Sequence, residues 1–231
     1  MLVATVIVLL WVAILALIKV LFSGSNGFEW GSVSDWFSFA CNVVMAGVAV
    51  YAARYAKLWF RQQSYATAFN KAEGVLNKID LLYNNLKELN ADATQAYEHM
   101  QFIESNLSLV SDTDFSEYDA KIQRLFALND EIRSIQNGYT NLSRWPIKRL
   151  KTKLIDQVIF DCLRLNSQYL AMAGSNRYAI YCAKHMDRSN FLLCFHDSKN
   201  AFEKIPIYLH NLQASYSAYN ELPFSAYFTH K

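Results

Sequence analysis

The chain has 231 residues, a formal net charge of +2 at pH 7 and 53% hydrophobic residues. A chain of this length accommodates one membrane segment and one modest globular domain. The hydrophobic residues are concentrated in the first 60 positions, so the mean hydropathy of +0.04 averages an apolar part with a remainder of soluble composition. The four cysteines are too sparse for a disulfide framework, which excludes the small disulfide-stapled class of fold.

An almost unbroken apolar run occupies the N-terminal part, from Leu2 to Ile18, and continues past Lys19 to Phe22. A helix needs about 20 apolar residues to cross a bilayer, and Lys19 can extend its ammonium group to the interface. A cleaved signal peptide is the alternative, but it has a basic segment before its apolar core and a small-residue cleavage site after it. The sequence has neither, so we expect a transmembrane helix over residues 2–22.

A second apolar segment follows a short polar loop. The loop, residues 23–35, contains no Lys or Arg, and the segment after it covers residues 36–56. Arg54, Lys57 and Arg61 come at its end. Because basic residues favour the cytoplasmic side of a membrane, we expect residues 1–60 to form a transmembrane helical hairpin with both chain termini in the cytoplasm.

One face of the second span has small residues at spacings of four, three and four: Asn42, Ala46, Ala49 and Ala53. Small side chains let helix backbones approach closely in lipid, and an asparagine there can hydrogen-bond across the contact. Two interpretations of this small face remain open. It packs on the first span of the same chain, or it associates with a second copy to form a homo-oligomer.

The rest of the chain, residues 61–231, has the pattern of a helical domain. Apolar residues recur every three or four positions from Tyr65 to Val110, which predicts that the second span continues as a long helix. A break is expected at residues 90–92, where Asp92 would cap a new helix.

Three further helices are expected downstream. The first begins after a turn at 111–114, with a capping box of Asp114 and Glu117, and ends at Gly138. The second begins at Trp145 and Pro146 and is interrupted near Gly174, and the third covers 197–220 with a kink near Pro206. The predicted fold class is therefore all-α: an N-terminal transmembrane helical hairpin followed by an elongated cytoplasmic helical bundle.

The charges of this domain are segregated along the chain. Residues 73–135 contain twelve acidic and five basic residues, a net of −7, whereas residues 144–204 contain eleven basic and five acidic residues, a net of +6. Such an arrangement indicates helices that pack against each other, or alternatively two faces offered to different partners.

Basic residues are most concentrated beside Trp145 and Pro146. This basic cluster consists of Arg144, Lys148, Arg149, Lys151 and Lys153. Such a density suits anionic lipid headgroups or the phosphates of a nucleic acid, and the alternative is a solvated helix terminus. Cations are unfavourable at a helix N-terminus because of the helix dipole, which argues that the cluster has a function.

Candidate catalytic and metal-binding residues are scarce. Zinc-competent side chains occur close together only at Cys182, His185, Cys194 and His196, and their spacing differs from that of structural zinc sites, so they form a weak candidate. No phosphate-binding loop, nucleophile elbow or acid/base pair is recognisable. We therefore predict no cofactor and no enzymatic activity.

The N-terminal pattern resembles the two-helix membrane effectors of bacterial retron anti-phage systems. The resemblance rests on the acidic outer loop and on the second span, from Trp36-Phe37-Ser38 to Arg54-Tyr55-Ala56-Lys57-Leu58-Trp59-Phe60-Arg61-Gln62, which runs into a helical domain. It implies a toxin in the bacterial inner membrane. In that family a reverse transcriptase with its RNA–DNA hybrid is thought to hold the effector inactive until phage infection, when the effector damages the membrane.

Three functional hypotheses follow from the sequence. The first is a membrane-perturbing effector that is released from an inhibitory nucleoprotein partner. The second is a membrane-tethered scaffold or sensor that binds a partner and does not damage the bilayer. The third, against which the lack of a catalytic motif argues, is a membrane-bound nuclease or metalloenzyme. In all three, the lipid bilayer is a partner of the chain.

Overall fold

The computed structural model describes residues 8, 11–19, 30–107 and 110–230, and these are almost entirely helical, which confirms the all-α class. The chain divides into two compact units, Met1–Arg61 and Gln62–Lys231. The long helices are α2 (Trp30–Ser105), α3 (Asp112–Asn141), α4 (Thr152–Lys184) and α5 (Arg188–Asn220). Short elements complete the chain: the 3-10 helices η2 (Leu142–Arg144) and η3 (Phe224–Ala226) and the strands β1 (Ile147–Arg149) and β2 (Phe228–His230).

In the first unit, residues 11–19 are helical, and the other parts of the predicted first span lie outside the described residues apart from residue 8. The predicted second span belongs to α2, which begins at Trp30. The expectation of a loop as far as residue 35 was therefore wrong in its last six positions. These positions contain no proline, and each residue added to an existing helix gains one backbone hydrogen bond.

The α2 helix continues without interruption to Ser105, as its apolar periodicity predicted. The expected break at residues 90–92 was wrong. Asp92 does not cap a helix, and its carboxylate instead pairs with Arg124 on α3, with 3.3 Å between Nη1 and Oδ2. Packing explains the continuity, because Leu89, Ala93 and Ala96 are buried on either side of this point.

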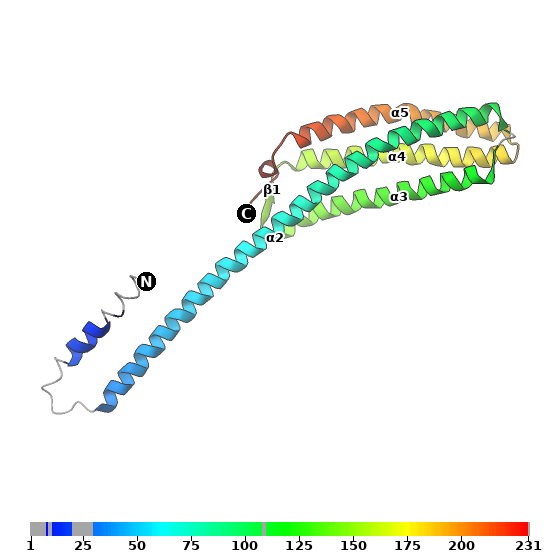
Figure 1. Cartoon of the computed structure of the whole chain (residues 1–231). Helices are drawn as coiled ribbons and strands as arrows, with labels where there is room; N and C mark the ends of the chain where they lie inside the picture. The colour runs from blue at the N-terminus through cyan, green and yellow to red at the C-terminus, as the bar shows by residue number, and fades with distance from the viewer. Residues whose placement is uncertain (1–7, 9–10, 20–29, 108–109, 231) are drawn as a thin grey trace. The chain divides into compact units, whose positions relative to one another are not determined.

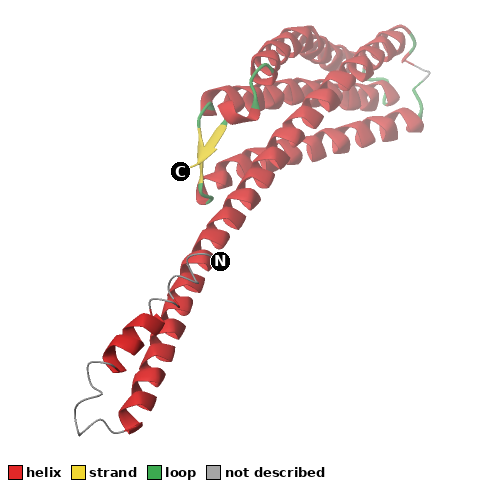
Figure 2. Cartoon of the chain, turned by 60° about the vertical axis from the view of Figure 1, so that its left-hand side comes forward, coloured by secondary structure: helices red, strands yellow, loops and turns green. Residues whose placement is uncertain are grey.

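The second unit is a bundle in which the C-terminal half of α2 lies beside α3, α4 and α5 (Figures 1 and 2). Hydrogen bonds to α2 carbonyl oxygens come from each of the other three helices. Tyr118 of α3 donates to Ala96, Tyr169 of α4 donates to Leu86, and Tyr219 of α5 donates to Leu76. Successive helices run in opposite directions, which is the up-down-up-down arrangement of simple four-helix bundles.

The predicted apolar faces form the core of this bundle. Ile79, Leu86 and Met100 of α2 are fully buried, as are Ile132 and Val158 from the next two helices. The segregated charges contribute one contact of the kind expected, an ion pair between Asp119 on α3 and Arg177 on α4. Both partners are substantially exposed to solvent, so this pair contributes little to stability.

The α3 helix begins three residues earlier than the sequence indicated, with Ser111 instead of Asp114 as its N-cap. Its capping box joins Ser111 to Asp114, rather than Asp114 to Glu117. The helix also passes through Gly138, which was expected to end it, and stops at Asn141. Gly138 faces Val75, and a Cβ atom placed there would lie 3.5 Å from Val75 Cγ2.

The segment after α3 contradicts the prediction of a helix starting at Trp145 and Pro146. It forms β1, which pairs antiparallel with β2 in the register Ile147 with His230. The physical reason lies in the C-terminal tail, whose Tyr227 and Phe228 are buried against the bundle. Pairing of the two strands satisfies their backbone groups at this position, and the α4 helix starts only at Thr152.

The last two helices are longer than expected. The α4 helix passes through Gly174, which was expected to interrupt it, and reaches Lys184. The α5 helix begins at Arg188, capped by Asp187, instead of at residue 197, and Pro206 lies inside it. Buried Phe191 and Phe195 stabilise this additional N-terminal part of α5.

Candidate functional site

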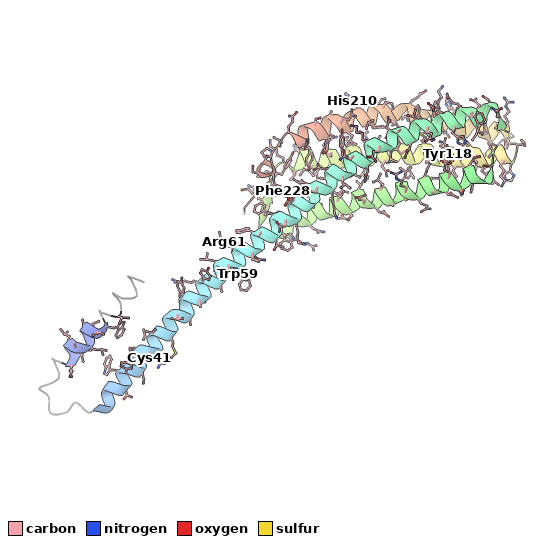
Figure 3. The ribbon with its side chains drawn as sticks, in the orientation of Figure 1. Cys41, Trp59, Arg61, Tyr118, His210 and Phe228 are labelled. Carbon is pink, nitrogen blue, oxygen red and sulfur yellow. The ribbon has the colours of Figure 1, made fainter. Side chains whose placement is uncertain are left out.

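A long exposed apolar segment is the main feature of the first unit. An 18-residue window of α2 has a mean hydropathy of 1.6, and none of it is buried. Figure 3 shows Cys41 and Trp59 on this part of the helix, with side chains projecting from the ribbon. Among the described residues, α2 is the one helix that is long and apolar enough to cross a membrane.

The C-terminal end of this segment combines aromatic rings with cations. Tyr51 and Tyr55 stack one turn apart, and Trp59 and Phe60 meet edge to face with their centroids 5.1 Å apart. Arg54, Lys57 and Arg61 are interleaved with these rings along the chain. Aromatic and basic residues of this kind are enriched where a transmembrane helix leaves the hydrocarbon core.

The small face predicted from the sequence lies within the apolar segment. All four of its members, Asn42, Ala46, Ala49 and Ala53, are exposed. Gly47, beside this face, has no heavy atom within 4 Å of the position that a Cβ would take. The face is therefore accessible along its length for close contact with another helix, and both interpretations of it stay open.

The basic cluster is brought to one end of the bundle, the end that carries β1 and β2, which we call the strand end (Figure 2). Its five members do not have equivalent roles. The guanidinium group of Arg149 lies over the ring of Tyr139, with Cζ 4.8 Å from the ring centroid, and Nη1 donates to the Tyr139 carbonyl at 3.3 Å. The α3 helix has no basic residue in its own last turn. Arg149 thus supplies a cation to the C-terminus of α3, and its role is structural.

The other four cations of the cluster are exposed, and we call them the basic surface. Arg144 ends η2, Lys148 lies in β1, Lys151 is the N-cap of α4, and Lys153 lies in its first turn. Among the described residues, no ion pair joins any of these side chains to a carboxylate. The first turn of α4 contains no acidic residue, and Lys151 makes no side-chain capping bond. The helix dipole therefore adds to the positive potential of this surface.

Two residues of this region were missed by the sequence reasoning. Leu150, which lies within the helix predicted to begin at Trp145, is 44% exposed between Arg149 and Lys151. Lys71 of α2 joins the same region, with its Nζ 5.0 Å from the centroid of the Trp145 ring. Nothing local in the sequence indicates the strand at Ile147–Arg149 or the contact with Lys71, because both depend on segments that are distant along the chain.

The four zinc-competent residues do not converge. No group of three or more His, Cys, Asp or Glu side chains able to hold a metal ion occurs among the described residues. Burial raises the pKa of both Cys182 and Cys194, and a hydrogen bond between these two thiols also affects their pKa values. His185 instead packs on the ring of Tyr181, with the centroids 4.5 Å apart. Neutral thiols are poor zinc ligands, because the metal binds the thiolate.

Polar contacts at partly and fully buried positions attach α5 to the other helices. Tyr216 stacks on Tyr83 of α2 with the centroids 3.8 Å apart, and its hydroxyl donates to Asp80 at 3.1 Å. Burial, reinforced by the negative charge of Asp80, raises the pKa of Tyr216 to about 12. Ser198 of α5 donates to buried Asn176 of α4. These contacts hold the bundle together, and we assign them no catalytic role.

The chain matches no protein-family model, no curated protein and no solved structure. The exposed apolar segment and the basic surface are the features of the described residues that bear on function.

Proposed function

We propose that this protein is a membrane-anchored effector of an anti-phage system, which perturbs the bacterial inner membrane when an inhibitory nucleoprotein partner releases it. Membrane anchoring is supported by the 18-residue apolar window of α2, none of which is buried against the rest of the protein. Burying such a surface in lipid is favourable by about 25 cal/mol for each Å² removed from water. In the proposal, residues 2–22 and the apolar part of α2 form a transmembrane hairpin.

The membrane-perturbing part of the proposal draws its support from the small face. Close helix approach in lipid depends on such residues, and Asn42, Ala46, Ala49 and Ala53 are all exposed. Self-association through this face would assemble spans from several copies. The identity of the inhibitor, a reverse transcriptase with its RNA–DNA hybrid, comes from the resemblance of the N-terminal pattern to retron effectors.

The test is expression of the chain alone in bacteria that carry a membrane-potential dye. The effector proposal expects growth arrest and loss of potential without any infection. The matched control is Val44→Asp combined with Val48→Asp, which places charges in the span at a cost of about 2.5–3.5 kcal/mol each. This variant should fail to insert and should be harmless at equal expression.

A membrane-tethered scaffold is the second candidate. The bundle favours it, because Gln62–Lys231 is a compact unit of its own that could bind a partner while the apolar segment serves only as an anchor. A wild-type chain that inserts, accumulates and leaves the membrane potential intact would support the scaffold and refute the effector.

Topology is tested separately from activity. A phosphatase fused after Lys231 should be inactive, and one inserted in residues 24–28 should be active, because Arg54, Lys57 and Arg61 favour the cytoplasm. The opposite pattern would place the bundle outside the cytoplasm and remove the basis for an intracellular inhibitor.

A further inference from the structure

The basic surface lies at the end of the bundle where α2 joins it. Lys71 of α2 contacts Trp145 at this end, and Phe69 of α2 contacts Phe224 of η3 with their centroids 5.7 Å apart. Figure 3 places Phe228 of β2 at the same end of the bundle, and Tyr118 toward the other end. The α2 residues at the strand end, Phe69 and Lys71, are thus among the first residues of the bundle after the apolar segment along the chain.

Few residues separate the end of the apolar segment from Lys71 at the strand end of the bundle. Phe60 is exposed and is the last apolar residue before Arg61, and eleven residues of helix from Phe60 to Lys71 extend about 16 Å. One headgroup layer of a bilayer is about 6 Å thick, and surface charges act over a further screening length of about 8 Å. These distances are comparable, so the chain allows the strand end to stay within the electrostatic range of a membrane that holds the apolar segment.

The composition of this surface favours lipid over nucleic acid. Leu150 is exposed between basic residues, and an apolar side chain among cations suits the boundary between headgroups and acyl chains. Trp145, the aromatic residue of the region, is half-buried with Lys71 over its ring, so it does not offer a free stacking platform for bases. The four exposed cations have no carboxylate partner in an ion pair among the described residues.

We propose that Arg144, Lys148, Lys151 and Lys153 bind anionic phospholipid headgroups and hold the strand end of the bundle against the membrane surface. This inference rests on the membrane anchoring in the proposed function and adds a second attachment to it. Each cation near an anionic surface contributes about five-fold to such a contact equilibrium. Because these contributions multiply, four cations together favour the contact by about 600-fold.

The experiment is lysine footprinting of the full chain in nanodiscs. The chain is reconstituted in phosphatidylcholine alone or in phosphatidylcholine with phosphatidylglycerol, and the acetylation rate of each lysine is read by mass spectrometry. Lys148, Lys151 and Lys153 should react several-fold more slowly in the anionic nanodiscs, and raised salt should restore their reactivity. Lys87 and Lys204, which are exposed elsewhere on the bundle, are internal references whose rates should not change.

A charge-matched pair of variants separates a specific contact from general attraction. Arg144→Gln with Lys148→Gln removes two cations from the basic surface, which should weaken the contact about 25-fold and abolish the protection of Lys151 and Lys153. Lys87→Gln with Arg133→Gln removes the same charge from exposed positions on α2 and α3 and should leave that protection intact.

The remaining outcomes overturn the inference in distinguishable ways. Equal acetylation rates in both kinds of nanodisc would refute the lipid contact while leaving the anchor in place. Protection by an added RNA–DNA hybrid in phosphatidylcholine nanodiscs, without protection by phosphatidylglycerol, would assign the surface to nucleic acid. Failure of the chain to co-elute with any nanodisc would refute the anchoring itself, and the headgroup contact with it.

Discussion

The structure predicts that Arg149 stabilises the fold, whereas its basic neighbours do not. Its guanidinium group stacks on Tyr139, donates to the Tyr139 carbonyl at 3.3 Å and lies at the C-terminus of α3. A cation–π contact at a partly exposed site contributes about 0.5–1 kcal/mol. A long hydrogen bond from a half-buried charged donor contributes about 1.5 kcal/mol, the low end of the usual range for charged groups. Arg149→Gln should therefore cost about 2 kcal/mol.

Thermal unfolding of the full chain in detergent, followed by circular dichroism, measures this effect. For a bundle of this size about 2 kcal/mol corresponds to a decrease in Tm of roughly 4–8 °C. Lys148→Gln removes the same charge from an exposed position of the same strand and should change stability by less than about 0.5 kcal/mol. Arg149→Lys keeps the charge but loses the planar stacking, so its Tm should be intermediate.

Equal Tm values for Arg149→Gln and Lys148→Gln would refute this division of the basic cluster. They would show that the contact between Arg149 and Tyr139 contributes no net stability. Arg149 would then have to be counted with the exposed cations of the basic surface.

Three further predictions test other parts of the structure. Gly138→Ala and Gly174→Ala should each stabilise the chain by about 0.5–1 kcal/mol, because both glycines lie inside helices with room for a methyl group; a lower Tm in either variant would show that its helix ends or bends there. Burial raises the pKa of Tyr216 to about 12, above an unfolded value of about 10, so its contribution to stability is complete below pH 10 and is lost between about pH 10 and 12. Denaturant midpoints should consequently fall more steeply over this range in the wild type than in Tyr216→Phe, and parallel profiles would contradict the assignment. Under the effector proposal, Ala49→Leu should blunt the loss of membrane potential on expression, because the larger side chain separates helices at the small face. Val44→Leu, on the opposite face of the helix, should not have this effect. Full activity of both variants would exclude self-association through the small face.

The helical faces and the apolar segment were predictable from the sequence because each depends on residues that are close together along the chain. The three-and-four spacing from Tyr65 to Val110 identifies the buried face of α2 without knowledge of its partners. The apolar composition before Arg54 likewise identifies a candidate span by itself. A helix start with a capping box in the neighbourhood of residues 111–114 was also predictable, since capping is a local interaction. The residues of the box were not, because it joins Ser111 to Asp114 and not Asp114 to Glu117.

Tertiary contacts decided where helices continue and what the basic cluster does. Residues 90–92, Gly138 and Gly174 were expected to interrupt or end helices, but the helices continue through them. A residue with poor helix propensity costs roughly 1 kcal/mol, and the burial of apolar residues on both sides of it contributes more than that. The strand at Ile147–Arg149 forms only because the C-terminal tail at Phe228–His230 returns to pair with it. That pairing, together with the ring of Tyr139, separates one structural arginine from the four exposed cations of the basic surface. No local pattern contains this distinction, because it depends on which distant groups each side chain meets.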